Sequence, residues 1–189
     1  MKFVHKIVLF LALLFIGSSN LYAYSYAAAG KELTIDSKEA IIKAINADDF
    51  DTAKKVFTKY EKNYKYLNDT FISKLHTSLK NAIENKDKKQ IVKSLELSLA
   101  GEVQRRISGG LENIKTFNVA KVMLAKANKF YELLAVSLDD DTNKKLKTSI
   151  KACMLSIGNP GLFGVGAKPA NKEEYIKNQK IIIDIIQSL

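Results

Sequence analysis

The chain has 189 residues, with 30 lysines and arginines against 20 aspartates and glutamates, so its formal net charge at pH 7 is +10. A single cysteine, Cys153, excludes an intramolecular disulfide and any zinc site that needs a pair of thiolates. Only two of the basic residues are arginines, the residue that nucleic-acid readers use for bidentate contacts. We therefore expect no specific nucleic-acid binding, although the charge favours nonspecific affinity for anionic surfaces.

Residues 1–23 have the organisation of a secretory signal peptide. Lys2 and Lys6 form a basic start, residues 7–16 are apolar throughout, and small residues follow. An apolar stretch of this length rises about 15 Å as a helix, half of a bilayer core of ~30 Å. The segment is therefore expected to be cleaved and not to anchor the protein in a membrane.

Cleavage is expected after Ala23, Ala27 or Ala29, where small residues precede the bond. No cysteine stands in this window, so attachment as a bacterial lipoprotein is not expected. Residues 24–36 would form a short N-terminal segment, and residues 37–189 would form one helical domain. The mature protein is predicted to be soluble and either periplasmic or extracellular.

Apolar residues recur with helical spacing through nearly all of the predicted domain. The first helix is expected to begin at a cap on Asp36 or Ser37 and to reach about Ala47. No alternating β-branched run bounded by turns occurs, so the fold is predicted to be all-α. We expect six or seven helices packed as antiparallel hairpins in a single compact domain. The helices after the first are predicted over about residues 50–67, 70–85, 88–108, 116–138, 142–157 and 175–189.

Two stretches of the chain resemble each other at an offset of 38 residues. They are "AINADDFDTAKKV" (residues 44–56) and "AIENKDKKQIVKS" (residues 82–94), and each pairs Ala-Ile with a later aspartate. Each is predicted to be the junction of a helical hairpin. A repeat array needs at least three copies of its unit, and only two similar stretches occur here. The sequence therefore predicts stacked hairpins but no particular repeat family.

The last predicted helix is rich in isoleucine and leaves little polar surface. It is therefore expected to be deeply buried. Its apolar residues are Ile176, Ile181, Ile182, Ile183, Ile185, Ile186 and Leu189.

A loop rich in glycine and proline, "SIGNPGLFGVGAKPANKEE" (residues 156–174), precedes that helix. A phosphate-binding P-loop needs G-x-x-x-x-G-K-[ST] between a strand and a helix. Here Lys168 comes one place too late, Pro169 follows it, and a helix precedes the loop. The nucleotide-binding interpretation is therefore set aside.

Two interpretations of the loop stay open. The favoured one is a structural corner, with Leu162, Phe163 and Val165 packed beneath it. In the alternative, Leu162 and Phe163 are exposed and contact a partner together with Lys168.

Arg105 and Arg106 are the only arginines, and they follow Glu102 near the end of a predicted helix. Cations at this position are stabilised by the helix dipole, which is a sufficient structural explanation. The alternative is that the arginine pair binds a carboxylate or phosphate of a ligand.

Catalytic motifs are absent from the sequence. His76 is the only histidine beyond the signal peptide, so no paired E-x-x-H and no H-E-x-x-H site can form there, and no G-x-S-x-G is present. His76 and Cys153 could in principle form a nucleophile pair, but both lie on predicted apolar stripes, where a thiol is usually inert. The protein is predicted not to be an enzyme.

The sequence therefore favours an exported, non-catalytic binding or scaffold protein that contacts a protein partner or a small ligand. No cofactor is required. The alternative is a helical bundle that binds haem, copper or iron through His76, with Met123, Cys153 or Met154 as the sulfur ligand. Since the chain has no C-x-x-C-H motif, such a haem would be bound non-covalently.

Overall fold

Seven α-helices follow one another through residue 30 and residues 32–189, the part of the chain that this computed structural model describes. No strand occurs there, which confirms the all-α prediction, and no helix there is long and apolar enough to cross a membrane. The predicted signal peptide and its cleavage positions lie outside the described residues. The helices are α2 (Leu33–Asn46), α3 (Phe50–Thr70), α4 (Leu75–Glu84), α5 (Lys88–Glu112), α6 (Phe117–Ala135), α7 (Asp140–Ser156) and α8 (Lys172–Ser188).

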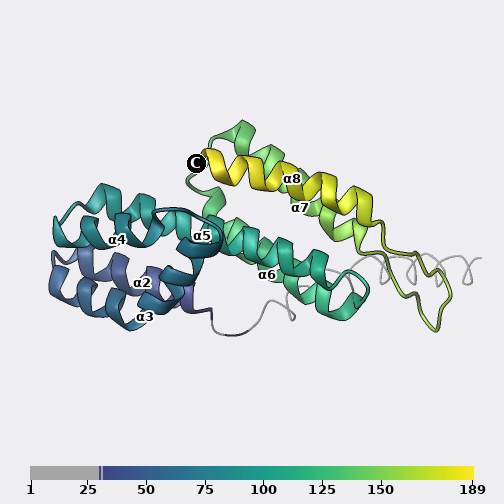
Figure 1. Cartoon of the computed structure of the whole chain (residues 1–189), viewed down its shortest axis with the longest axis horizontal. Helices are drawn as coiled ribbons and strands as arrows, with labels where there is room; N and C mark the ends of the chain where they lie inside the picture. Colours follow the sequence, from purple (N-terminus) through teal and green to yellow (C-terminus); the bar gives the residue numbers. More distant parts are fainter. Residues whose placement is uncertain (1–29, 31) are drawn as a thin grey trace, which may run out of the picture.

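Each helix packs against the next one along the chain, so the molecule is a series of helical hairpins (Figure 1). Helices α2, α3 and α4 form one end of an elongated shape, and α6, α7 and α8 form the other. The long helix α5 joins the two ends, because it contacts α2, α3 and α4 as well as α6 and α8.

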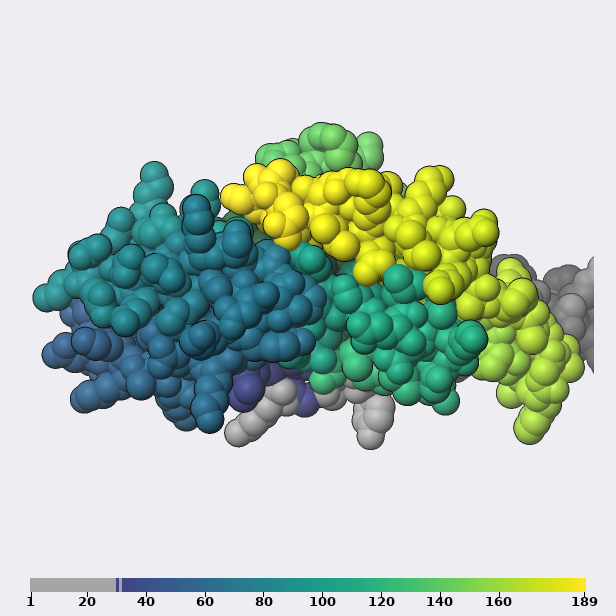
Figure 2. Space-filling view, in the orientation of Figure 1, coloured from purple at the N-terminus to yellow at the C-terminus, as the bar shows by residue number. Residues whose placement is uncertain are grey.

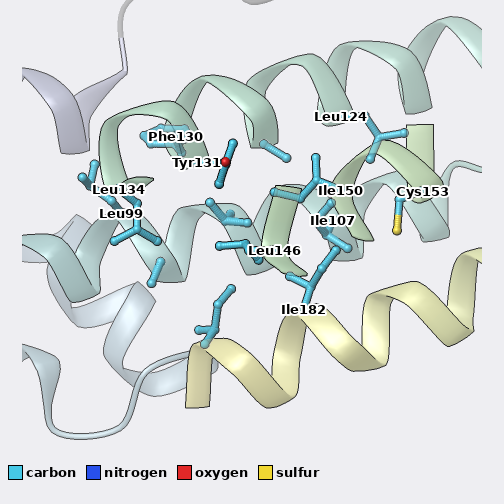
Figure 3. Packing of buried hydrophobic residues seen from close by; sticks show 14 of the residues in the cluster. Leu99, Ile107, Leu124, Phe130, Tyr131, Leu134, Leu146, Ile150, Cys153 and Ile182 are labelled. Atoms are coloured by element: carbon cyan, nitrogen blue, oxygen red, sulfur yellow. The ribbon is translucent and has the colours of Figure 1, made fainter. Parts of the chain in front are cut away.

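The buried apolar residues form two clusters that share α5. The first cluster unites α2, α3, α4 and the start of α5, as far as Leu95. The second cluster is larger and unites the rest of α5 with α6, α7 and α8 (Figure 3). Leu67 at the end of α3 and Leu75 at the start of α4 also belong to it. The apolar residues that recur with helical spacing along α5 are all buried. They are Ile91, Leu95, Leu99, Val103 and Ile107.

The similarity at an offset of 38 residues corresponds to a turn that is built twice. Asp48 and Lys86 both have positive φ, 56° and 57°. The next residue in each turn caps the following helix: the Asp49 carboxylate accepts from the amide of Thr52, and the Asp87 carboxylate accepts from that of Gln90. The prediction that these stretches join helical hairpins is therefore confirmed, for α2–α3 and α4–α5.

Helix α2 begins at Leu33, earlier than the predicted cap on Asp36 or Ser37. Asp36 lies within the first turn, and the side chain of Ser37 is buried and hydrogen-bonded to the Tyr64 hydroxyl at 2.7 Å. The Ser37 hydroxyl, which the sequence offered as a helix cap, is instead used in this contact between α2 and α3. The start of a helix can be displaced in this way when its polar residues face the interior.

Helix α8 is buried along one stripe only, so the prediction of deep burial was wrong. Tyr175, Ile182 and Ile186 face the second cluster, whereas Ile176 and Ile181 are exposed. Because α8 lies at the surface of the helix series, it has packing partners on one side only (Figure 1).

Candidate functional site

The loop between α7 and α8 is a short hairpin that projects from one end of the molecule (Figures 1 and 2). Its outer pair is Asn159 and Lys168, joined by backbone hydrogen bonds of 2.9 and 2.7 Å. Its inner pair is Leu162 and Val165, joined by bonds of 3.1 and 3.0 Å. The glycine- and proline-rich segment therefore has a defined hydrogen-bonded geometry.

Phe163 and Gly164 are the two central residues of the hairpin turn. Both have positive φ, 51° and 85°, which is the pattern of a type I′ turn. Glycine adopts this conformation freely, but for a bulky aromatic residue it is unfavourable. The turn would favour asparagine or glycine at position 163, so local backbone preference does not explain a phenylalanine there.

Two glycines allow the arms of the hairpin to lie close together, because they have no Cβ atom. A Cβ atom at Gly161 would overlap the carbonyl oxygen of Val165, and one at Gly158 would overlap that of Lys168. Both glycines also have positive φ, 74° and 75°. The amide of Asn171 closes the base by donating to the Ser156 carbonyl at 2.8 Å. The position of the turn is thus fixed by backbone contacts.

The apolar side chains of the turn face solvent. Leu162 is 76 % exposed, Phe163 is 99 % exposed and Val165 is 79 % exposed. The favoured interpretation, in which these residues pack beneath a corner, is therefore wrong, because the paired arms direct the turn away from the helices. We refer to Leu162, Phe163 and Val165 as the hairpin tip.

A hollow of about 610 Å³ lies at the base of the hairpin. Ile114, from the connection between α5 and α6, and Phe117, the first residue of α6, form one part of its wall, and Pro160 forms another. Lys115 and Lys168 also line this hollow, so lysines from two segments lie at the base of the hairpin.

Arg105 and Arg106 do not point into a free pocket but lie in an ionic network with carboxylates of the same chain. Arg106 contacts Glu32 at 2.7 Å and Glu102 at 3.7 Å, and Arg105 contacts Glu102 at 3.0 Å. Lys126 contacts the other oxygen of Glu32 at 2.7 Å. We call these five residues the ionic network.

Neutral side chains extend the ionic network toward α2 and α3. The hydroxyl of Thr34 donates to Glu102 at 2.7 Å, and the Asn63 amide donates to that hydroxyl at 2.8 Å. Both glutamates are buried. The network therefore ties the start of α2 to α3, α5 and α6. Sequence reasoning named the arginine pair but missed Glu32 and Lys126, since no local pattern links residues so far apart.

His76 lies on the first cluster and is paired with an acid from α3. Its Nε2 atom is 2.9 Å from the Glu61 carboxylate, and its ring is 5.5 Å from that of Phe57. Its backbone amide donates to the Asn68 side chain at 3.1 Å. One of the two ring nitrogens, Nε2, is thus engaged by a carboxylate of the protein.

The sulfur-containing candidates lie on other helices. Cys153 is buried in the second cluster, where its thiol donates to the Tyr175 carbonyl at 3.8 Å, and Met154 packs against the same cluster. Burial, with a smaller contribution from the nearby Glu174 carboxylate, raises the pKa of the Cys153 thiol to about 12. Met123 lies beside Arg106, with its sulfur 4.0 Å from the guanidinium.

The structure therefore does not bring His76 into one cluster with Cys153 and Met154. Across residue 30 and residues 32–189, no group of three or more histidines, cysteines or acids is arranged to hold a metal ion.

A second concave region lies where the two ends of the molecule meet. This groove, of about 500 Å³, runs between the first half of α5, the corner joining α6 to α7, and the C-terminal residue. Val92, Leu97 and Leu138 line it, together with Lys89 and Lys93. It is a candidate site for a small apolar ligand, but its charged lining has mixed sign because Glu96 lines it too.

Comparisons of this chain with family models, with curated proteins and with solved structures find no match.

Proposed function

We propose that this protein is an exported, non-catalytic binding protein whose contact site is the hairpin tip. The observation that carries the proposal is Phe163, which is 99 % exposed at a turn position that disfavours it. Unfavourable backbone conformations are retained mainly where function requires them. A side chain that lowers the stability of its own turn and packs against nothing is best explained by a contact outside the chain.

The frame around the tip supports the proposal. Gly158 and Gly161 permit backbone contacts that a larger residue would block, and four backbone hydrogen bonds join the arms. A contact surface that is fixed in advance loses less conformational entropy when it binds. The apolar groups also lie next to one another, whereas exposed apolar residues elsewhere in a monomer are normally scattered.

The side chains with catalytic potential support a non-catalytic role. The Cys153 thiol is buried and its pKa is raised to about 12, so little thiolate exists at neutral pH. His76 is paired with Glu61, and both arginines contact glutamates of the same chain. The alternative, a haem, copper or iron site on His76, stays a prediction, and the absorption spectrum and metal content of the purified protein test it.

A photo-reactive phenylalanine analogue at position 163 tests the proposed contact in cells that export the protein. The matched control carries the same analogue at Val136, which is 89 % exposed at the end of α6. We expect cross-linked products when the analogue is at position 163 that are not formed when it is at position 136. Equal or absent cross-linking from the two positions would contradict the proposal.

A further inference from the structure

The hairpin tip is narrow and convex. Figure 2 shows the hairpin, in yellow-green, projecting beyond the helices at one end of the molecule. Stable protein–protein interfaces bury about 800 Å² on each partner and use roughly 20–30 residues a side. Three apolar side chains on a projection supply much less contact area. The interfacial region of a bilayer is deformable and can surround a small inserted tip. Binding to it therefore does not need the large flat contact area of a protein–protein interface.

The chain segment that leads into and through the hairpin carries charge of one sign. Residues 142–172 contain no aspartate or glutamate, and this segment covers most of α7 and the whole hairpin. Six lysines lie in the segment and all are exposed: Lys144, Lys145, Lys147, Lys151, Lys168 and Lys172. Lys145 forms an ion pair with Asp141, which stands just outside the segment.

The lysines nearest the tip are suitably placed to contact a charged surface while the tip enters it. Lys168 pairs with Asn159 across the hairpin, and Lys115 lines the hollow at the hairpin base. The first acids after the segment are Glu173 and Glu174, in the first turn of α8. Lys177 of the same helix lies 3.9 Å from the Glu174 carboxylate, which offsets part of its charge.

We infer that the contact partner of the hairpin tip is an anionic lipid surface, with Leu162, Phe163 and Val165 inserted among the acyl chains and the lysines facing the headgroups. This inference rests on the proposed function, because it names the partner of the same site. Apolar insertion combined with lysine attraction is the usual basis of peripheral membrane binding. Attachment through the tip would be peripheral and reversible, because only three side chains are inserted.

Vesicle flotation tests the inference with protein purified from the exported fraction, so that the predicted signal peptide adds no affinity of its own. We expect binding to vesicles of equimolar phosphatidylglycerol and phosphatidylcholine, and little binding to phosphatidylcholine alone. Higher salt should weaken the binding, because it screens the lysines.

Phe163→Asn is the decisive variant, because asparagine accepts the positive φ of this turn and leaves the fold intact. Removing the inserted ring should weaken vesicle binding by roughly tenfold or more. Val165→Ser should weaken it less, since a smaller side chain is removed. Val136→Ser removes a valine elsewhere that is even more exposed than Val165, and it should leave binding unchanged.

Insertion itself is measured with Phe163→Trp, because the chain has no other tryptophan. Its fluorescence should shift to the blue with anionic vesicles, while that of Val136→Trp should not. Binding without this shift, or binding that Phe163→Asn leaves unchanged, would overturn the inference.

The cross-linking experiment separates this inference from the proposed function. If vesicles do not bind but position 163 cross-links to one protein, the site is a protein contact and only the lipid inference fails. If vesicles do not bind and position 163 gives no specific product, the proposed function fails as well.

Discussion

Two regions of this protein reverse the usual placement of side chains. The ionic network puts the charged groups of Glu32, Glu102 and Arg106 inside the molecule. The hairpin tip puts Leu162 and Phe163 outside it. Charged residues are rarely buried without partners, and adjacent apolar residues are rarely exposed without a binding role.

The two regions differ in whether their unusual groups have partners within the chain. Glu32 is contacted by Arg106 and Lys126, and Glu102 by both arginines and Thr34. The side chain of Phe163 has no comparable contact, because it is almost wholly exposed. We therefore expect substitutions in the ionic network to change stability, and substitutions in the hairpin tip to change binding.

The largest effect is expected for Arg106→Met, which removes a cation and leaves two buried carboxylates with fewer partners. Breaking a buried ion pair from one side destabilises a protein by about 3–5 kcal/mol. Urea unfolding followed by circular dichroism measures the loss. The control is Lys180→Met, which breaks an exposed pair with Asp184 at 2.7 Å and should change stability by less than about 0.5 kcal/mol. Equal effects of the two variants would show that the network does not stabilise the fold.

Much of the helical part of the fold could be predicted from the sequence, because helix periodicity and turn residues are local properties. The helical spacing of apolar residues predicted a helix over about residues 88–108, and its residues from Ile91 to Ile107 at that spacing are buried. The two similar stretches were predicted to join hairpins, and both do so. The start of α2 was missed, because Glu32, Thr34 and Ser37 are used in tertiary contacts. Such contacts leave no periodic signal.

The sequence identified the apolar residues of the hairpin tip, but it did not determine whether their side chains are packed or exposed. Leu162 and Phe163 were identified as apolar residues in a glycine-rich loop, which fits both a packed corner and a projecting hairpin. The pairing of Asn159 with Lys168 decides between these arrangements, and it depends on backbone geometry. Likewise, Arg106 and Glu32 are 74 residues apart in the chain, so their contact could not be inferred from spacing.

Thr34→Val should have the next largest effect, because it removes a neutral side chain that is hydrogen-bonded to the ionic network. Valine keeps the shape of threonine but loses the bond to Glu102 and the bond from Asn63. A hydrogen bond to a charged group contributes about 1.5–3 kcal/mol. We expect a loss in that range by urea unfolding. Thr58→Val is the control, since the Thr58 hydroxyl bonds only to the exposed Lys54 carbonyl of its own helix. A similar loss of stability in both variants would mean that replacing any helical threonine by valine has this effect, and that the bond to Glu102 is not responsible.

Phe163→Asn should have a smaller effect of opposite sign on the stability of the hairpin. Asparagine tolerates the positive φ at this position, whereas left-handed conformations of other residues are unfavourable by about 1–2 kcal/mol. The amide of Val165, which donates to the Leu162 carbonyl at 3.0 Å, reports on the hairpin by hydrogen exchange. Its exchange should slow by about fivefold or more. Faster exchange would show that the phenylalanine stabilises the turn, which would remove the main reason for assigning it to binding.

The smallest effect on stability is expected for Val165→Ser in the hairpin tip. Val165 is 79 % exposed, so its side chain gains almost nothing from burial when the chain folds. Substitutions at such positions usually change stability by less than about 0.5 kcal/mol. The matched variant is Val103→Ser in α5, where the same change introduces a hydroxyl into the second cluster. That variant should lose about 2 kcal/mol or more, because it removes buried apolar surface and buries a polar group. Urea unfolding compares the two directly. If Val165→Ser destabilised the protein as strongly as Val103→Ser, the hairpin tip would be part of the packed structure, and its apolar residues would need no partner.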